Sequence, residues 1–136
     1  MKKVGFIGAS DKTDLITYVA KVLEQLGKKV IVVDTTIMQK TKYIVPAIDP
    51  TKCYITDFDN VDYAIGFESI QYLAHYLGVR EYNNWDSWHY DYMLLDIDSE
   101  VNIDNFEIEE TDKNYFVTKF DIYSLRKGIE ILDSLS

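Results

Sequence analysis

Apolar residues near the start of the chain follow two different spacings, which predict a strand, a helix and a second strand. Residues 4–8 (VGFIG) and 28–34 (KKVIVVD) are short runs of Val, Ile and Phe bounded by turn residues, as expected of buried strands. Gly27 follows the intervening segment, at a position where a left-handed residue commonly closes a helix. The pattern predicts one βαβ unit with an amphipathic crossover helix. The apolar face of that helix carries Leu15, Ile16, Val19, Val22, Leu23 and Leu26.

Four later segments have the composition of strands. Residues 54–55 are short enough to form an edge strand. Residues 61–67 (VDYAIGF), 90–98 (YDYMLLDID) and 114–119 (NYFVTK) are longer runs rich in apolar and aromatic residues. Together with the two strands of the opening unit, these segments predict a sheet that forms the centre of the domain.

Helical spacing returns between and after these strands. Residues 68–77 and 124–135 each place four apolar residues on one face, which predicts two further amphipathic helices. Residues 35–42 predict a short polar helix. Residues 80–89, rich in Trp, Tyr and Asn, predict an exposed aromatic loop, and the acidic residues 100–112 predict a second loop.

The alternation of strands and helices predicts an α/β fold. Helical crossovers cover a mostly parallel sheet on both faces, so we expect a three-layer sandwich with residues 3–7 as its central strand. A chain of 136 residues with 47% hydrophobic content can bury one substantial core. The sequence therefore predicts a single domain spanning residues 1–136.

Charge and composition narrow the class of partner. A net charge of −9 disfavours direct contact with nucleic acid or an anionic membrane, because both are bound largely through Lys and Arg. The single cysteine, Cys53, cannot form an intramolecular disulfide, and no apolar run approaches the roughly 20 residues needed to span a bilayer. These features predict a cytoplasmic protein without a transmembrane segment.

Candidate chemistry lies at one end of the predicted sheet. In a βαβ unit, free backbone N–H groups at the start of the crossover helix attract anions, so residues 8–13 are a candidate phosphate site. Asp34, Asp96 and Asp98 end two of the predicted strands, and the carboxyl ends of parallel strands meet at the same edge. Carboxylates gathered there offer the oxygen ligands that a divalent cation prefers.

The arrangement of these segments resembles the MinD/ParA family of P-loop ATPases, which have a deviant Walker A motif. That family opens with a strand, KGGxGKT, a helix and GKKVLLID. This chain has Asp11-Lys12-Thr13 in place of Gly-Lys-Thr, followed at the same interval by GKKVIVVD. YDYMLLDID resembles the Walker B strand, with Asp96 as its acid, and FVTKFDIYSLRKGIEIL resembles a later strand and helix that often read VTTPDPxSLRDAxxLL.

The resemblance implies a P-loop NTPase or Rossmann-like fold and a nucleotide site. It implies ATP or ADP with Mg²⁺ as the cofactor. It also implies a protein partner, with a second copy of the chain as one candidate. The metal would be held by Thr13, Asp34 and Asp96. The residues that match the phosphate-binding loop are Gly8, Ser10, Asp11, Lys12 and Thr13.

Three departures weaken the implied activity. Ile7 stands where the family has the lysine that reaches the partner's nucleotide. Asp11 replaces the glycine before the second lysine, and its carboxylate repels phosphate by about 4 kcal/mol at 4 Å and an effective dielectric of 20. The chain also ends before the segment from which the family commonly recognises adenine.

Three functions stay open on these grounds. The altered loop favours a degenerate, non-catalytic module for binding, positioning or assembly, for example at a cell pole or in a surface or secretion apparatus. A weak or partner-activated Mg-ATPase would need Lys12, Thr13 and Asp96 to hold nucleotide despite Asp11. A receiver-like regulatory domain fits the length, but Phe67 and Glu68 stand where the phosphorylated Asp of a receiver would be expected.

Overall fold

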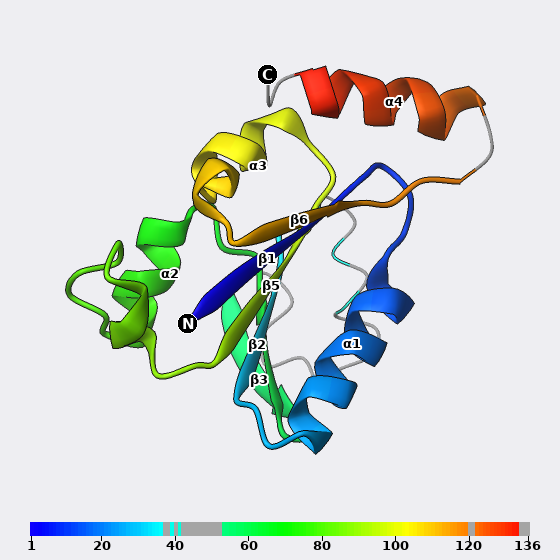
Figure 1. Ribbon diagram of the computed structural model, residues 1–136. Helices are drawn as coiled ribbons and strands as arrows, with labels where there is room; N and C mark the ends of the chain where they lie inside the picture. Colours follow the sequence, from blue (N-terminus) through cyan, green and yellow to red (C-terminus); the bar gives the residue numbers. More distant parts are fainter. Residues whose placement is uncertain (37–38, 40, 42–52, 120–121, 134–136) are drawn as a thin grey trace.

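The computed structural model describes residues 1–36, 39, 41, 53–119 and 122–133. These residues form an α/β fold around a six-stranded, mostly parallel sheet, as the alternation of strands and helices predicts. The strand order is β3-β4-β2-β5-β1-β6, and all neighbouring strands are parallel except β3 and β4 (Figure 1). The strands are β1 (Lys2–Ile7), β2 (Val30–Asp34), β3 (Tyr54–Phe58), β4 (Val61–Ile65), β5 (Tyr92–Ile97) and β6 (Lys113–Phe116).

The helices begin and end at residues with clear local reasons. Ser69 accepts a hydrogen bond from the backbone N–H of Tyr72 at the start of α2, and Gly78 ends α2 in the left-handed conformation. Gly27, also left-handed, follows α1, as its position in the sequence predicts. The α-helices are α1 (Thr13–Gln25), α2 (Ile70–Leu77), α3 (Glu100–Asn105) and α4 (Ile122–Asp133), with 3₁₀ turns η2 (Trp85–Trp88) and η3 (Ile108–Glu110).

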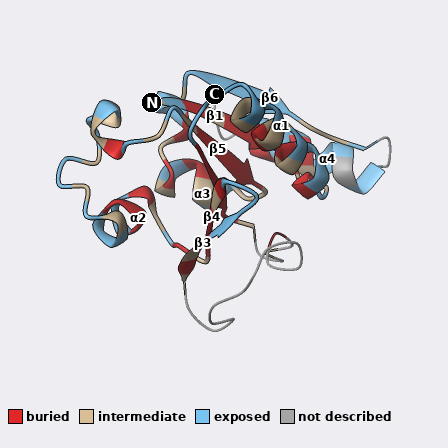
Figure 2. Cartoon of the chain, turned by 90° about the horizontal axis from the view of Figure 1, so that it is seen from below, coloured by how far each residue is buried: buried red, intermediate tan, exposed pale blue. Residues whose placement is uncertain are grey.

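The two faces of the sheet carry separate hydrophobic clusters, because successive strand residues point to opposite faces. On one face, Ile16 and Ala20 of α1 pack among Phe6, Val32 and Leu94. On the other, residues of α2, α3 and η3 pack with Ile31, Val33, Met93, Leu95 and Ile97. Figure 1 shows α1 on one side of the strands and α2 and α3 on the other. The buried residues follow the strands through the middle of the molecule (Figure 2).

One feature of the sheet differs from the prediction, and a second was not predicted. β1 is not central: it lies between β5 and the edge strand β6. β3 and β4 form an antiparallel hairpin, because Asp59 and Asn60 both adopt the left-handed conformation typical of two-residue turns between antiparallel strands.

Two predicted loops contain more structure than expected. Residues 100–112 form α3 and η3, and Ile103, Phe106 and Ile108 are buried there, so the prediction of a loop was wrong. Residues 80–89 are not wholly exposed, because Trp88 is buried and its indole N–H donates to the carbonyl of Tyr82. Half of the predicted polar helix at 35–42, namely residues 37, 38, 40 and 42, lies outside the described residues.

No helix in the described residues is a candidate for a membrane span. None of the helices there combines the length and the hydrophobicity that crossing a bilayer requires.

Candidate functional site

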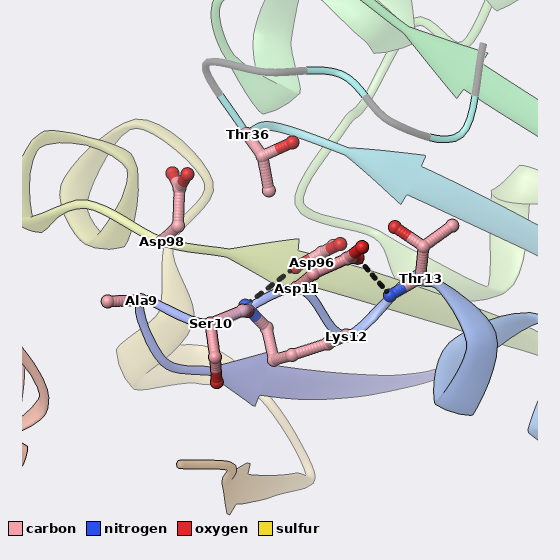
Figure 3. A pocket seen from close by; sticks show the side chains of 8 residues that line it. All are labelled: Ala9, Ser10, Asp11, Lys12, Thr13, Thr36, Asp96 and Asp98. Carbon is pink, nitrogen blue, oxygen red and sulfur yellow. Dashed lines mark hydrogen bonds and ion pairs between the residues drawn. The ribbon is translucent and has the colours of Figure 1, made fainter. Parts of the chain in front are cut away.

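The carboxyl ends of β1, β2 and β5 lie at one edge of the sheet, next to a small cavity. Asp34 and Asp96 are register partners on β2 and β5, as the sequence predicts. The chain leaves β1 through Gly8, whose backbone N–H donates to the carbonyl of Ile97. The cavity measures about 110 Å³ (Figure 3). The described residues that line it are Ala9, Ser10, Asp11, Lys12, Thr13, Thr36, Asp96 and Asp98.

Lys12 is held inside the site by groups of its own domain. Its ammonium lies 2.9 Å from Asp96 Oδ1 and forms a buried ion pair, at angles outside those of a hydrogen bond. The same ammonium donates to the carbonyl of Gly8 at 2.6 Å and to that of Ser10 at 3.3 Å. The two carbonyls belong to the loop between β1 and α1, and Asp96 belongs to β5. The carboxylate of Asp96 thus already neutralises the positive charge of Lys12 in this structure.

Asp11 occupies the amino end of α1. Its Oδ1 accepts a hydrogen bond of 2.9 Å from the backbone N–H of Thr13, the first residue of the helix (Figure 3). A free N–H at this position is one of the donors that an anion would use at a helix amino terminus. The carboxylate of Asp11 therefore stands in the place of an external anion.

The carboxyl group of Asp96 has a raised pKa. Burial raises its pKa from 3.8 to about 6, the charge of Lys12 opposes that rise, and the neighbouring charges of Asp34 and Asp98 add to it. Both hydrogen bonds to its backbone carbonyl come from Thr35, through the N–H at 3.2 Å and the hydroxyl at 2.6 Å. These contacts fix the end of β5 against the segment that follows β2.

Asp34 shapes the loop after β2. Its Oδ1 accepts hydrogen bonds from the backbone N–H and the hydroxyl of Thr36, at 2.9 and 2.6 Å, and its Oδ2 accepts one from the N–H of Thr41 at 3.3 Å. Thr36 in turn faces the cavity. The structure thus brings Asp34 close to Asp96 in register, but it gives the Asp34 carboxylate a role in organising the loop.

Gly8 permits a close approach between two loops. A Cβ added to Gly8 would overlap the carbonyl of Val117, which follows β6. The N–H of Val117 donates to the carbonyl of Ile7 at 2.8 Å, so this contact ties the start of the candidate phosphate loop to the edge strand. Ile7 itself is buried in the core.

The charge and size of the cavity restrict its chemistry. Three carboxylates line it against one lysine, so its field favours a cation over a phosphate. Pockets for drug-sized ligands measure about 300–1,000 Å³, and this cavity is smaller. Among the described residues, no three His, Cys, Asp or Glu side chains are arranged to hold a metal ion. Thr13, Asp34 and Asp96, the three positions that the resemblance implies as metal ligands, include only two carboxylates.

Sequence reasoning placed most of these residues together but missed the residues that support them. Asn102, from the helix α3 that was predicted as a loop, donates to the carbonyl of Thr35 at 2.9 Å. Thr35 and Thr36 were assigned only to a polar segment. A signal was present, since Thr side chains after a strand that ends in Asp commonly bond to that Asp or to nearby backbone.

Comparisons with known proteins do not assign this chain to a family. No protein-family model and no curated protein matches this chain. The resemblance to the MinD/ParA family therefore stays a prediction that rests on the residues of the two strands and of the loop between β1 and α1.

Proposed function

We propose that this chain is a degenerate MinD/ParA-like domain that binds a protein partner and does not hydrolyse ATP. Its fold would be the three-layer sandwich of P-loop proteins, and its role would be to position or assemble a partner in the cytoplasm. The resemblance supplies the family, and the state of the loop between β1 and α1 supplies the loss of activity.

One observation carries the proposal: the Lys12 ammonium and the Thr13 N–H, which would bind phosphate, already bind other atoms of the same domain. The Lys12 ammonium is paired with Asp96 and with two loop carbonyls, and the N–H of Thr13 is bound to Asp11. A phosphate would have to displace a buried ion pair and a carboxylate before it gained any contact. Breaking a buried pair by removing one partner typically costs about 3–5 kcal/mol, which is a large fraction of a weak binding energy.

Calorimetric titration with Mg-ATP and Mg-ADP tests the proposal directly. We expect no saturable binding up to millimolar nucleotide, and no phosphate release above the buffer blank. Hydrolysis by the purified chain that disappears in Lys12→Ala would overturn the proposal, because it would show that Lys12 reaches the nucleotide.

A partner-activated Mg-ATPase is the second candidate, and one observation favours it. Lys12, Thr13 and Asp96, the residues that such an enzyme needs, line the same cavity. A partner that moved Asp11 away from Thr13 would restore a donor at the helix start. The two candidates differ in a measurable way: the ATPase would bind Mg-nucleotide more tightly in the presence of its partner, whereas the non-catalytic module would bind its partner equally well with and without nucleotide.

A further inference from the structure

A groove runs between α1 and the hairpin of β3 and β4. It measures about 290 Å³ and shares no lining residue with the cavity at the ends of β1, β2 and β5. Positions 14, 17, 18 and 21 of α1 line one wall, and their spacing of three, one and three residues places them on one side of the helix. Phe58 and Asp59, at the tip of the hairpin, line the opposite wall.

Two aromatic side chains of the groove remain exposed. Tyr18 is 70% exposed and Phe58 is 38% exposed. Ile16 and Ala20, which point to the sheet, are the residues through which α1 packs on the core, so Tyr18 belongs to a different side of the helix. The face of an aromatic ring carries partial negative charge and attracts cations.

The acids of the groove differ in their partners. The ammonium of Lys21 lies 3.0 Å from Asp59 Oδ1 and 2.9 Å from Glu24 Oε2, so this lysine is already paired and ties the hairpin to α1. Asp14, seven residues earlier on the same side of the helix, is exposed and makes no ion pair or side-chain hydrogen bond with another described residue. The acids in and beside the groove outnumber its lysine, which leaves the groove negatively charged.

The pairing of a carboxylate with an aromatic ring selects the type of cation. Asp14 and Tyr18 are four residues apart and are therefore neighbours on the surface of the helix. A guanidinium group uses both, because its planar fork forms paired hydrogen bonds with a carboxylate and its face stacks on an aromatic ring. An ammonium is a compact, strongly hydrated charge that gains less from the ring. The net charge of −9 further favours a basic ligand through long-range attraction.

We propose that this groove binds an arginine side chain presented by a basic partner protein, with the guanidinium on Asp14 and Tyr18 and the aliphatic stem along Phe58. The inference deepens the proposed function and rests on it for one point, that the partner is a protein. Because the groove and the cavity have no lining residue in common, the titration with nucleotide and the titration with arginine can fail separately.

Titration of the isotope-labelled full chain with the peptide acetyl-Gly-Arg-Gly-amide, followed by amide chemical shifts at constant ionic strength, tests the groove. We expect saturable shifts centred on Asp14, Tyr18 and Phe58, with a Kd on the order of 10 mM, as suits one exposed ion pair and one cation–π contact. The same peptide with lysine in place of arginine should bind about threefold more weakly. The peptide with citrulline, which has the shape of arginine without its charge, should give no saturable shift.

Two variants separate the ion pair from the ring. Asp14→Asn and Tyr18→Leu should each weaken binding of the arginine peptide by about threefold. Tyr18→Leu should also abolish the preference for arginine over lysine, because only the ring distinguishes the two cations strongly. The matched controls are Asp104→Asn, which removes an exposed acid from α3 on the other face of the sheet, and Tyr123→Leu, which removes a tyrosine that is 73% exposed on α4. Both controls should bind the peptide like the wild type.

Several results would overturn the proposal. An arginine peptide that gives no saturable shift, or whose shifts centre on another surface, does not bind in this groove. A lysine peptide that binds the wild type as tightly as the arginine peptide shows attraction by charge alone. Unchanged binding in both Asp14→Asn and Tyr18→Leu shows that neither side chain contacts the ligand. Thermal melts verify that each variant is folded, and all four substituted side chains are exposed.

Discussion

The ammonium of Lys12 and Oδ1 of Asp96 lie 2.9 Å apart, and both side chains are almost completely buried. This pair joins the start of α1 to the end of β5 at the point where the resemblance implies a phosphate and a metal. Separating the two buried charges costs free energy. Because the two charges neutralise each other, the pair has no net charge to attract an external ligand. The pair is therefore the structural basis of the inactivity proposed for the domain, and removal of either member leaves the other charge buried without compensation.

Lys12→Met should destabilise the domain by about 3 kcal/mol at pH 8, because it leaves the buried Asp96 carboxylate without its counter-charge. Urea denaturation followed by circular dichroism measures the change in the free energy of unfolding. At pH 5 the loss should be smaller, since Asp96, with a pKa of about 6, is then mostly protonated in the folded state. The double variant Lys12→Met/Asp96→Asn should lose less stability than the sum of the two single variants. A simple sum at pH 8 would mean that the two side chains do not interact.

Stability should fall as the pH rises from about 4 to 6 because of Asp96. Its pKa is raised from 3.8 to about 6 in the folded state, so in this window the folded protein holds a proton that the unfolded chain has released. Below pH 4 the raised pKa of Asp96 contributes up to about 3 kcal/mol to the free energy of unfolding. This contribution is lost above pH 6. Asp96→Asn removes this dependence, so the difference in unfolding free energy between wild type and variant should change across pH 4–6 and stay constant from pH 7 to 8. A constant difference throughout would show that the Asp96 pKa is not raised.

Asp11→Gly should strengthen the binding of pyrophosphate or Mg-nucleotide. The substitution removes a carboxylate from the cavity and frees the N–H of Thr13. Asp11 is not the N-cap residue of α1, so the substitution loses one side-chain hydrogen bond, about 0.5–1.5 kcal/mol, which is too little to unfold the domain. Calorimetry with pyrophosphate measures the gain, and Asp14→Asn, which removes a charge from the first turn of the same helix, is the control. No binding to Asp11→Gly at millimolar ligand would mean that the Lys12–Asp96 pair by itself keeps the site closed.

Lys3→Met should stabilise the domain at neutral pH by about 1–2 kcal/mol, because it replaces a buried amine by an apolar side chain of similar length. Lys3 is 1% exposed, and its ammonium lies 3.8 Å from the centroid of the Trp85 ring. Burial lowers its pKa from 10.5 to about 8, against the opposing charges of Glu107, Glu110 and Asp112.

The pH dependence of the Lys3 effect follows from the lowered pKa. Between pH 8 and 10.5 the unfolded chain holds a proton that the folded state has lost, so wild-type stability should rise through this range. The gain in unfolding free energy of Lys3→Met over the wild type should therefore be smaller at pH 10.5 than at pH 7. Guanidinium denaturation at pH 7 and 10.5 checks both points, with Lys2→Met on the exposed neighbouring position as the control. A gain that is equal at both pH values would contradict a buried, perturbed lysine.

Local patterns in the sequence determined the elements on which the site rests. Apolar runs gave β1, β2 and β5, helical spacing gave α1 and α4, and the acid at the end of β5 pointed to Asp96. These predictions succeeded because burial on a strand or a helix leaves a periodic signal within a few residues. The common edge of Asp34 and Asp96 followed from the rule that parallel strands end together.

The tertiary structure alone decided which groups bind each other at that edge. Nothing in the local sequence says that Lys12 turns to Asp96 or that Asn102 reaches Thr35, since these partners are 84 and 67 residues apart in the chain. The helix α3 was missed because its acids obscure the apolar spacing that packing against the sheet reveals. Side-chain partners depend on how strands and loops meet in space, and that meeting is set by the packing of the whole domain.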